Sequence, residues 1–420
     1  MRVGIVSECP WVPSSFGKMV FYLAKGLIDE GFKTTVYCPT SPSPTIFSRK
    51  FLFKTKCDVE RFCVDAEIET SQYLSFASGE EDLFIVFGTP YGSVEVSALN
   101  VCENLSKPCL GYFVTESLTL PSTIALWVTK VSFVATPTDF VRRVFIDGVK
   151  RFSRELGEEA EKRFMVAPHG INLDLYSRAV CEYLRDYTTH HGRSTELVEK
   201  IREARETGRT VVGFYAKNNP RKDVAALIKA VSSLGDEYLL LPILIEAVSS
   251  NAWADLATLV SFFMSPEESA RRIIWVDPEA GKYGVTDYSI IRVLCNTDVF
   301  AYPTEGEAFG IPVVEALALE VPVVVTDIPV MREVLSGYPE EGFARCREDI
   351  YPPAYVLCNP DPEDVAEAIK RVSERREEIR RIARSIASRY DYRRMVREII
   401  KAMTRAEEFF RETKTNKWSK

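Results

Sequence analysis

Short apolar runs alternate along most of the chain with longer segments whose apolar residues recur every three or four positions. Runs such as 2–6, 83–87 and 210–216 predict buried strands. The segment after the first run places Val20, Leu23 and Leu27 on one face, and so predicts an amphipathic helix. Strands that alternate with helices in this way predict parallel sheets covered by helices.

The stretch 298–326 shows this pattern most clearly. The apolar run 299–302 predicts a strand, and a polar loop follows it. Pro312 begins a predicted helix over 312–319, because a proline lacks the N–H that would be unpaired at the first helical position. A second apolar run at 321–325 predicts the next strand. The loop therefore lies at the carboxyl end of a parallel strand, where open sheets bind ligands.

Two glutamates stand in this stretch with seven residues between them. Glu307 lies in the loop and Glu315 about one turn into the predicted helix. The backbone N–H groups of Phe309, Gly310 and Ile311 can point outward at the helix N-terminus, which favours an anionic ligand. The alternative interpretation is a pair of solvated glutamates on a surface loop and helix.

The spacing, and the phrase EAFGIPVVEALALEVPVVVTD around it, resemble the Glu-x7-Glu motif of the retaining glycosyltransferases of family four, which have the GT-B fold. In that family the first glutamate and the loop amides hold the donor sugar, and the second glutamate binds the nucleotide ribose. The resemblance implies these roles for Glu307 and Glu315. Glu320 departs from the pattern, because the family usually has glycine there, and this puts the geometry of the turn in question.

A second set of candidates follows the strand predicted at 210–216. The family has an arginine and a lysine five residues apart at this point, and they grip the donor phosphates. Lys217 and Lys222 have this spacing, so a lysine replaces the usual arginine. Lysine binds phosphate as a point charge, without the bidentate fork of arginine, and Arg221 could supply part of that fork. A solvated basic loop is the alternative.

The first half of the chain offers four weaker candidates. Gly17 lies in the first loop, which the resemblance places under the donor diphosphate, although an ordinary strand-to-helix connection fits equally well. Glu116 follows the run 111–114, where the family often has a histidine, and is either an acceptor-side base or a capping residue. His169 replaces the family's usual asparagine and is more often structural in such a place, whereas Gly170 is expected to bring backbone close to the cleft.

Composition sets the broad class. A length of 420 residues predicts two domains, and 46% hydrophobic with 27% charged residues is typical of soluble globular proteins. The net charge of −7 argues against nucleic-acid binding. Residue 1 leads directly into a strand, so we expect no signal peptide. No apolar stretch reaches the ~20 residues of a membrane helix. We expect a cytoplasmic protein and leave peripheral membrane contact open.

The ten cysteines include no Cys-x-x-Cys pair and no regular spacing. Cys38, Cys109, Cys295 and Cys358 lie in or beside apolar runs, which predicts buried free thiols. With only three histidines in the chain, we expect no zinc site. We expect no cofactor.

The resemblance implies a GT-B fold: an acceptor-binding Rossmann-like domain at 1–175, a nucleotide-sugar-binding domain at 176–390, and a cleft between them. The segment 391–420 is expected to be a helix that crosses back to the first domain, with a frayed tail. The reaction would be retaining transfer of a hexosyl group to a glycan, lipid or small-molecule acceptor. The alternatives are an epimerase or phosphorylase of the same fold and a non-catalytic nucleotide-sugar-binding protein.

We expect the transfer to need no divalent metal. Glycosyltransferases of the other large fold hold a cation with an Asp-x-Asp pair, and the nearest match in this chain is Glu305-Gly306-Glu307. Glu307 already belongs to the Glu-x7-Glu spacing. Lys217, Lys222 and the positive end of the helix that begins near Pro312 would neutralise the diphosphate in place of a cation.

Overall fold

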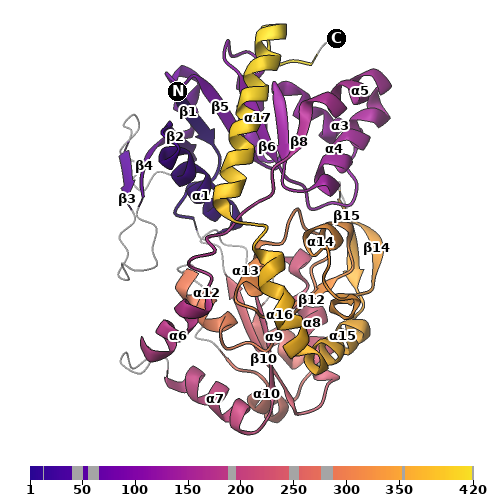
Figure 1. The fold of residues 1–420 in the computed structure, drawn as a ribbon. Coiled ribbons are helices and arrows are strands. Elements are labelled where there is room, and N and C mark those ends of the chain that lie inside the picture. Colours follow the sequence, from indigo (N-terminus) through magenta and orange to yellow (C-terminus); the bar gives the residue numbers. More distant parts are fainter. Residues whose placement is uncertain are drawn as a thin grey trace. The chain divides into compact units, whose positions relative to one another are not determined.

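The computed structural model describes residues 1–12, 14–39, 51–54, 66–187, 195–245, 255–275, 287–351 and 355–418 (Figure 1). The chain forms two compact units. Unit 1 comprises Met1–Asn172, Ile350–Val356 and Tyr390–Lys420, and unit 2 comprises Leu173–Asp349 and Leu357–Arg389.

Unit 1 is built on an eight-stranded sheet in the order β3-β4-β2-β1-β5-β6-β7-β8. Within this sheet, the printed register of β3 with β4 is antiparallel and the other described pairings are parallel. In the parallel part, Val3 of β1 lies beside Leu83 of β5. The strands are β1 (Arg2–Val6), β2 (Lys33–Cys38), β3 (Phe51–Lys54), β4 (Glu67–Gln72), β5 (Leu83–Gly88), β6 (Cys109–Phe113), β7 (Phe133–Thr136) and β8 (Phe164–Val166). The helices include α1 (Ser15–Asp29), α2 (Ser93–Cys102), α3 (Ser122–Ala125), α4 (Asp139–Phe152), α5 (Arg154–Arg163) and α17 (Tyr392–Thr413).

Unit 2 holds a five-stranded parallel sheet in the order β10-β9-β11-β12-β13. Its strands are β9 (Thr210–Lys217), β10 (Tyr238–Ile245), β11 (Val299–Tyr302), β12 (Val323–Thr326) and β13 (Phe343–Ala344), and β14 (Cys346–Tyr351) pairs separately with β15 (Tyr355–Pro360). The helices include α6 (Arg178–Tyr187), α7 (Thr195–Glu206), α8 (Val224–Ser232), α9 (Leu256–Ser261), α10 (Pro266–Arg272), α12 (Asp287–Leu294), α13 (Ile311–Ala318), α14 (Pro329–Val334), α15 (Pro362–Glu374) and α16 (Arg376–Ala387). The two sheets, one mostly and one entirely parallel, confirm the α/β fold class expected from the apolar pattern.

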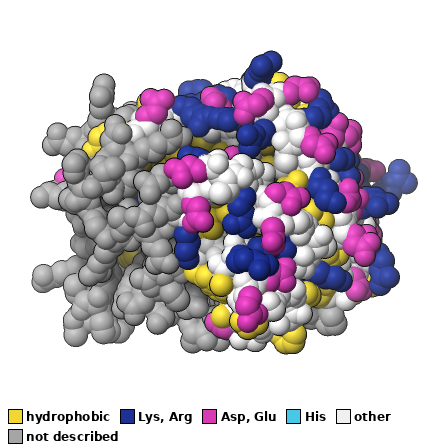
Figure 2. Space-filling view, turned by 90° about the horizontal axis from the view of Figure 1, so that it is seen from below, with side chains coloured by type: hydrophobic (Ala, Val, Ile, Leu, Met, Phe, Trp, Pro, Cys, Tyr) yellow, Lys and Arg dark blue, Asp and Glu magenta, His cyan; other side chains and the backbone are white. Residues whose placement is uncertain are grey.

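Seen from below, the described surface carries Lys and Arg side chains intermingled with Asp and Glu (Figure 2). This mixture is typical of the solvated surface of a soluble domain. No helix among the described residues is both long enough and apolar enough to cross a membrane.

The end of the chain is anchored in unit 1, so the predicted frayed tail is wrong for residues 414–418. Helix α17 stacks Tyr392 on Tyr22 of α1, with ring centroids 5.0 Å apart. Beyond the helix, Asn416 is fully buried and accepts a hydrogen bond from the Cys109 N–H at 2.9 Å. The Trp418 indole donates to the carbonyl oxygen of Val131 at 2.9 Å. The polar residues at this end of the sequence predicted a free tail. In the structure, Asn416 and Trp418 instead form hydrogen bonds with backbone groups near the amino ends of β6 and β7.

The prediction of free thiols is wrong for three of the four cysteines. The pairs Cys9–Cys38, Cys181–Cys295 and Cys346–Cys358 form disulfides, and only Cys109 of the predicted set is a buried free thiol. The pairs join residues 29, 114 and 12 positions apart, so spacing along the chain could not reveal them. Disulfides persist in oxidising surroundings and inside hyperthermophiles.

Candidate functional site

The carboxyl ends of two neighbouring strands, β9 and β11, carry the candidate donor site of unit 2. The strands are parallel, with Val212 beside Val299. The loops that follow them are joined by hydrogen bonds: the Glu305 N–H and the Thr304 hydroxyl both donate to the carbonyl oxygen of Arg221, at 2.9 and 3.2 Å. The basic loop and the glutamate loop are therefore one structural element.

Glu307 lies at the centre of this element and is 9% exposed. Its Oε1 atom forms an ion pair with the ammonium of Lys222, which is also buried, and a second ion pair with Arg221 Nη1 at 3.2 Å. The Tyr302 hydroxyl donates to the same oxygen at 2.9 Å. The structure therefore brings Lys222, Arg221 and Glu307 into contact, and their role in donor binding stays a prediction.

These contacts determine the ionisation of Glu307. Burial alone would raise the pKa of the carboxyl, but the charges of Lys222 and Arg221, with hydrogen bonds from Lys222 and Tyr302, lower its pKa to about 2. Glu307 is therefore a carboxylate at neutral pH. It can accept hydrogen bonds from sugar hydroxyls.

The two lysines differ in their surroundings, which the sequence did not distinguish. Lys217 is the last residue of β9 and is exposed. Lys222 ends a short 3-10 helix, Pro220–Lys222, after which Asp223 adopts a left-handed conformation (φ 41°) and caps α8 by accepting from the Ala226 N–H at 3.0 Å. This turn directs Lys222 toward Glu307, whereas Lys217 is open to a ligand from solvent.

Helix α13 begins directly after the glutamate loop. It starts one residue earlier than predicted, at Ile311, because Gly310 forms its N-cap at φ +87°. This positive φ angle favours glycine at residue 310, and a Cβ atom there would also lie 2.7 Å from the flexible end of the Met331 side chain. Phe309 and Ile311 are both buried.

Glu315 is the one charged side chain of α13 and is fully buried. Burying a charged group is costly unless polar partners or a ligand compensate. Its position within an otherwise apolar helix is therefore consistent with a binding role.

Sequence reasoning missed Tyr302 and Thr304, which contact Glu307 at 2.9 and 3.4 Å. Both residues carry a hydroxyl at the end of the strand that precedes the glutamate loop, and this position was the signal that could have identified them.

Three of the candidates in unit 1, Gly17, His169 and Gly170, make packing contacts. A Cβ atom on Gly17 would collide with the carbonyl oxygen of Val12, and one on Gly170 would lie 2.5 Å from the Cα atom of Tyr392. His169 is buried, with its Nδ1 atom 2.6 Å from the Tyr112 hydroxyl, and burial lowers its pKa to about 3. A neutral core histidine agrees with the structural alternative for His169.

At the carboxyl edge of the unit 1 sheet, the sequence analysis named Glu116 but missed a second carboxyl, that of Glu95. Glu116 follows β6 and is half-buried. Glu95, in the first turn of α2, lies after the neighbouring strand β5. Burial, with a smaller contribution from the charge of Glu8, raises the pKa of Glu95 to about 7, although a backbone hydrogen bond opposes the shift. Such a carboxyl can exchange a proton near neutral pH.

The raised pKa of Glu95 predicts a pH-dependent stability. A group whose folded pKa lies above its unfolded value of about 4.3 stabilises the fold fully below that value, and this stabilisation is lost as the pH rises through about 7. We therefore expect Glu95→Gln to raise the melting temperature more at pH 8 than at pH 5. Equal shifts at the two pH values would contradict the assignment.

Within the described part of the chain, no group of three or more His, Cys, Asp or Glu side chains is arranged to hold a metal ion. Glu305 and Glu307 remain the nearest match in the sequence to a metal-binding Asp-x-Asp pair. Because Glu307 is held by Lys222 and Arg221, a cation at its Oε1 atom would lie beside two positive charges.

Comparisons with known proteins agree with this geometry. Residues 283–389, which include the glutamate loop and α13, match the family of glycosyl transferases group 1. A phosphatidyl-myo-inositol mannosyltransferase of Mycobacterium leprae is 24% identical over 348 residues, covering 80% of this chain and 81% of that protein. The O-antigen chain mannosyltransferase RfbU of Salmonella typhimurium is 36% identical over 95 residues, 22% of each protein.

Solved structures show the same fold at low sequence identity. Alr3699/HepE of Anabaena, in complex with UDP and glucose, superimposes with a TM-score of 0.65 at 16% identity, covering 96% of this chain and 99% of that one. A sucrose-phosphate synthase of Thermosynechococcus elongatus has a TM-score of 0.63 at 14% identity, covering 96% and 98%. With the match over residues 283–389, these findings show that the chain has the GT-B fold and is similar to the group 1 glycosyl transferases.

Proposed function

We propose that the protein transfers a hexosyl group from a nucleotide-sugar, with retention of configuration, to a glycan, lipid or small-molecule acceptor. The buried Glu307 carboxylate, held among Lys222, Arg221 and Tyr302 beside the N-terminus of α13, is the observation that carries this proposal. Relatives that are mannosyltransferases and a neighbour that was solved with UDP and glucose support a nucleotide-sugar as the donor.

Each group of unit 2 would act on one part of the donor. Glu307 would accept hydrogen bonds from the sugar hydroxyls, and Glu315 would bind the ribose. The departing diphosphate gains negative charge in the transition state. Lys217, Lys222 and the backbone N–H groups of Phe309, Gly310 and Ile311 would stabilise that charge. Arg221 would keep the basic loop and Glu307 together.

Unit 1 would bind the acceptor. Glu116 is our candidate for an acceptor-side base, and Glu95 is a second carboxyl at the same sheet edge. We keep Gly17, His169 and Gly170 as residues that shape this part of the protein rather than as groups that perform chemistry, because their contacts are with the core of unit 1. Contact with a membrane surface would follow only if the acceptor is a lipid.

A donor screen tests the proposal. We expect one or a few nucleotide-sugars, among them GDP-mannose and UDP-glucose, to raise the melting temperature, because a ligand that binds only the folded state stabilises it. The stabilising donor should then be consumed only when an acceptor is present. Consumption with free nucleotide released and no acceptor would favour an epimerase, dependence on phosphate a phosphorylase, and binding without turnover a non-catalytic protein.

The same assay includes a chelator arm. We propose that no divalent metal is needed, since two lysines and a helix N-terminus already surround the diphosphate position. Transfer should survive excess EDTA and respond little to Mg²⁺ or Mn²⁺. Loss of activity with EDTA, recovery with Mn²⁺ and renewed loss in Glu305→Ala would contradict this part of the proposal.

A further inference from the structure

The loop that carries Glu307 is held from both sides at one residue, Glu305. The Glu305 N–H donates to the carbonyl oxygen of Arg221 in the basic loop at 2.9 Å. The Glu305 carbonyl oxygen accepts a hydrogen bond from the Cys358 N–H of β15 at 2.8 Å. Because Glu305 lies two residues before Glu307, the position of the glutamate loop depends on β15 as well as on the basic loop.

Cys358 is joined covalently to the main sheet of unit 2. It forms a disulfide with Cys346, 12 positions earlier in the chain. Cys346 lies two residues after Ala344, which ends β13 and accepts a hydrogen bond from the Asp327 N–H at 2.7 Å. The sulfur of Cys346 also lies 3.6 Å from the carbonyl oxygen of Asp327, directly after β12. The disulfide therefore ties β15 to the carboxyl edge of the sheet, where the candidate site lies.

Strand β14, which Cys346 begins, gains little stability from burial. Among the described strands it pairs with β15 alone, and Arg347, Glu348 and Asp349 are exposed. A two-stranded sheet is marginally stable in water by itself, and a disulfide across it favours the paired strands by restricting the unfolded chain. The hydrogen bond from the Asp361 N–H to the carbonyl oxygen of residue 345, at 2.9 Å, does not need the disulfide. Reduction is therefore expected to loosen the strand pair without unfolding it.

The two cysteines differ in exposure, since Cys358 is 6% exposed and Cys346 is half-buried. A dithiol reductant would therefore attack the sulfur of Cys346. A new S–S bond forms there, the bond between the two cysteines breaks, and Cys358 leaves as a thiolate and takes up a proton. The second thiol of the reductant then displaces Cys346. Two electrons and two protons pass to the protein, and the reductant becomes a disulfide.

We propose that Cys358 is a positioning residue for the donor site, and that its disulfide with Cys346 makes donor binding sensitive to thiol reductants. With the disulfide intact, β15 holds the Glu305 carbonyl and so keeps the glutamate loop and the N-terminus of α13 in place. After reduction the loop gains freedom, and a ligand must order it on binding, which lowers the affinity. The effect on donor binding rests on the proposed function, whereas the link between disulfide and loop does not.

Hydrogen–deuterium exchange on the full chain tests this link without a ligand. Dithiothreitol should speed exchange several-fold in peptides that cover 304–310 and at the Cys358 amide of the folded wild-type protein, and should leave β9 unchanged. The variant Cys346→Ser/Cys358→Ser should show the faster exchange with and without reductant. The same exchange over 304–310 in the oxidised and reduced wild-type protein would overturn the proposal, even if the variant does not fold.

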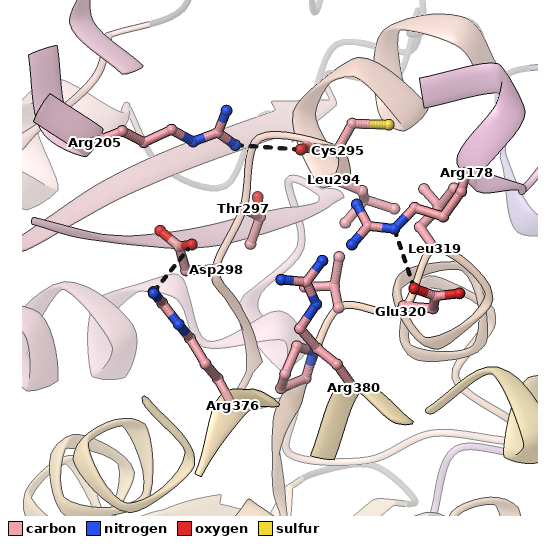
Figure 3. Close-up of a pocket in the computed structure, with 12 residues that line it drawn as sticks. Arg178, Arg205, Leu294, Cys295, Thr297, Asp298, Leu319, Glu320, Arg376 and Arg380 are labelled. Carbon is pink, nitrogen blue, oxygen red and sulfur yellow. Dashed lines mark hydrogen bonds and ion pairs between the residues drawn. The ribbon is translucent and has the colours of Figure 1, made fainter. Parts of the chain in front are cut away.

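The Cys181–Cys295 disulfide is the matched control within unit 2. Figure 3 shows Cys295 in the wall of a pocket that also includes Asp298, the residue directly before β11. This disulfide therefore lies toward the amino end of β11, whereas the glutamate loop follows its carboxyl end. In Cys181→Ser/Cys295→Ser, dithiothreitol should still speed exchange over 304–310. Loss of the response in this variant would assign the sensitivity to the control disulfide and contradict the proposal.

Calorimetric titration with UDP and GDP measures the consequence for the donor site. Reduction of the wild-type protein should weaken binding of the nucleoside diphosphate about three- to tenfold, comparable to the loss of one hydrogen bond. Uridine and guanosine, which lack the phosphates, should bind equally well before and after reduction. An unchanged diphosphate affinity beside faster exchange would remove the positioning role of Cys358. If the oxidised protein binds no nucleoside diphosphate, the proposed function fails together with the effect on donor binding, and the exchange result still decides the link to the loop.

Discussion

Replacing Glu307 by glutamine is expected to lower turnover by about ten- to a hundredfold, because the sugar hydroxyls would lose hydrogen bonds to a charged acceptor. The affinity for the nucleoside diphosphate of the preferred donor should stay nearly constant, because the diphosphate contacts other groups. Glutamine keeps an oxygen that can accept from Lys222 and Tyr302, which makes it the least disruptive change. Unchanged turnover would remove Glu307 from the site.

A stability measurement separates the catalytic effect from loss of the buried ion pair. The folded pKa of Glu307, about 2, lies below the unfolded value near 4.3. The carboxylate therefore stabilises the fold above pH ~4.3, and this stabilisation is lost as the pH falls toward 2. The difference in melting temperature between wild type and Glu307→Gln should shrink over this interval. A constant difference would mean that the ion pair does not stabilise the protein.

The two lysines should respond differently to removal. Lys222→Ala leaves the Glu307 carboxylate buried with fewer partners, and breaking such a pair costs about 3–5 kcal/mol of unfolding free energy. Lys217→Ala changes an exposed side chain, and its effect on stability should remain within about 0.5 kcal/mol. Both variants should bind the diphosphate about tenfold or more weakly.

Denaturant unfolding and calorimetry measure the two effects separately. Titration with the nucleoside, which lacks the phosphates, is the control and should give nearly the same affinity in all three proteins. Equal stability of the two variants would show that the ion pair of Lys222 contributes little. If nucleoside and diphosphate weaken together, the lysines support the fold rather than the phosphates.

The sequence predicted those parts of the site that are local in the chain. The strand, loop and helix around Glu307 and Glu315 lie within 298–326, and the period of the apolar residues and one proline were sufficient to locate them. The contact of Lys222 with Glu307 joins residues 85 positions apart. Spacing therefore placed Lys217 and Lys222 in the same role, whereas the turn at Asp223 determines which of them reaches the glutamate.

The failed predictions share a physical cause. A cysteine beside an apolar run is buried whether or not it is bonded, so hydrophobicity could not distinguish the pair Cys181–Cys295 from the free thiol of Cys109. A polar tail is normally solvated, but Asn416 is buried because it accepts a hydrogen bond from the first N–H of β6, which is distant in the chain. The sequence did raise the question of the turn at Glu320, and the structure shows its left-handed backbone.

The buried residues Asn416 and Trp418 have a consequence for synthesis of the chain. Their partners, Cys109 and Val131, belong to the first third of the sequence and leave the ribosome some 300 residues earlier. Translation proceeds at ~5–20 residues per second, so these two backbone groups near the amino ends of β6 and β7 lack their hydrogen-bond partners for tens of seconds. Most of unit 2 emerges during this time and can fold. Unit 1 is thus completed only after residues 416 and 418 have been synthesised.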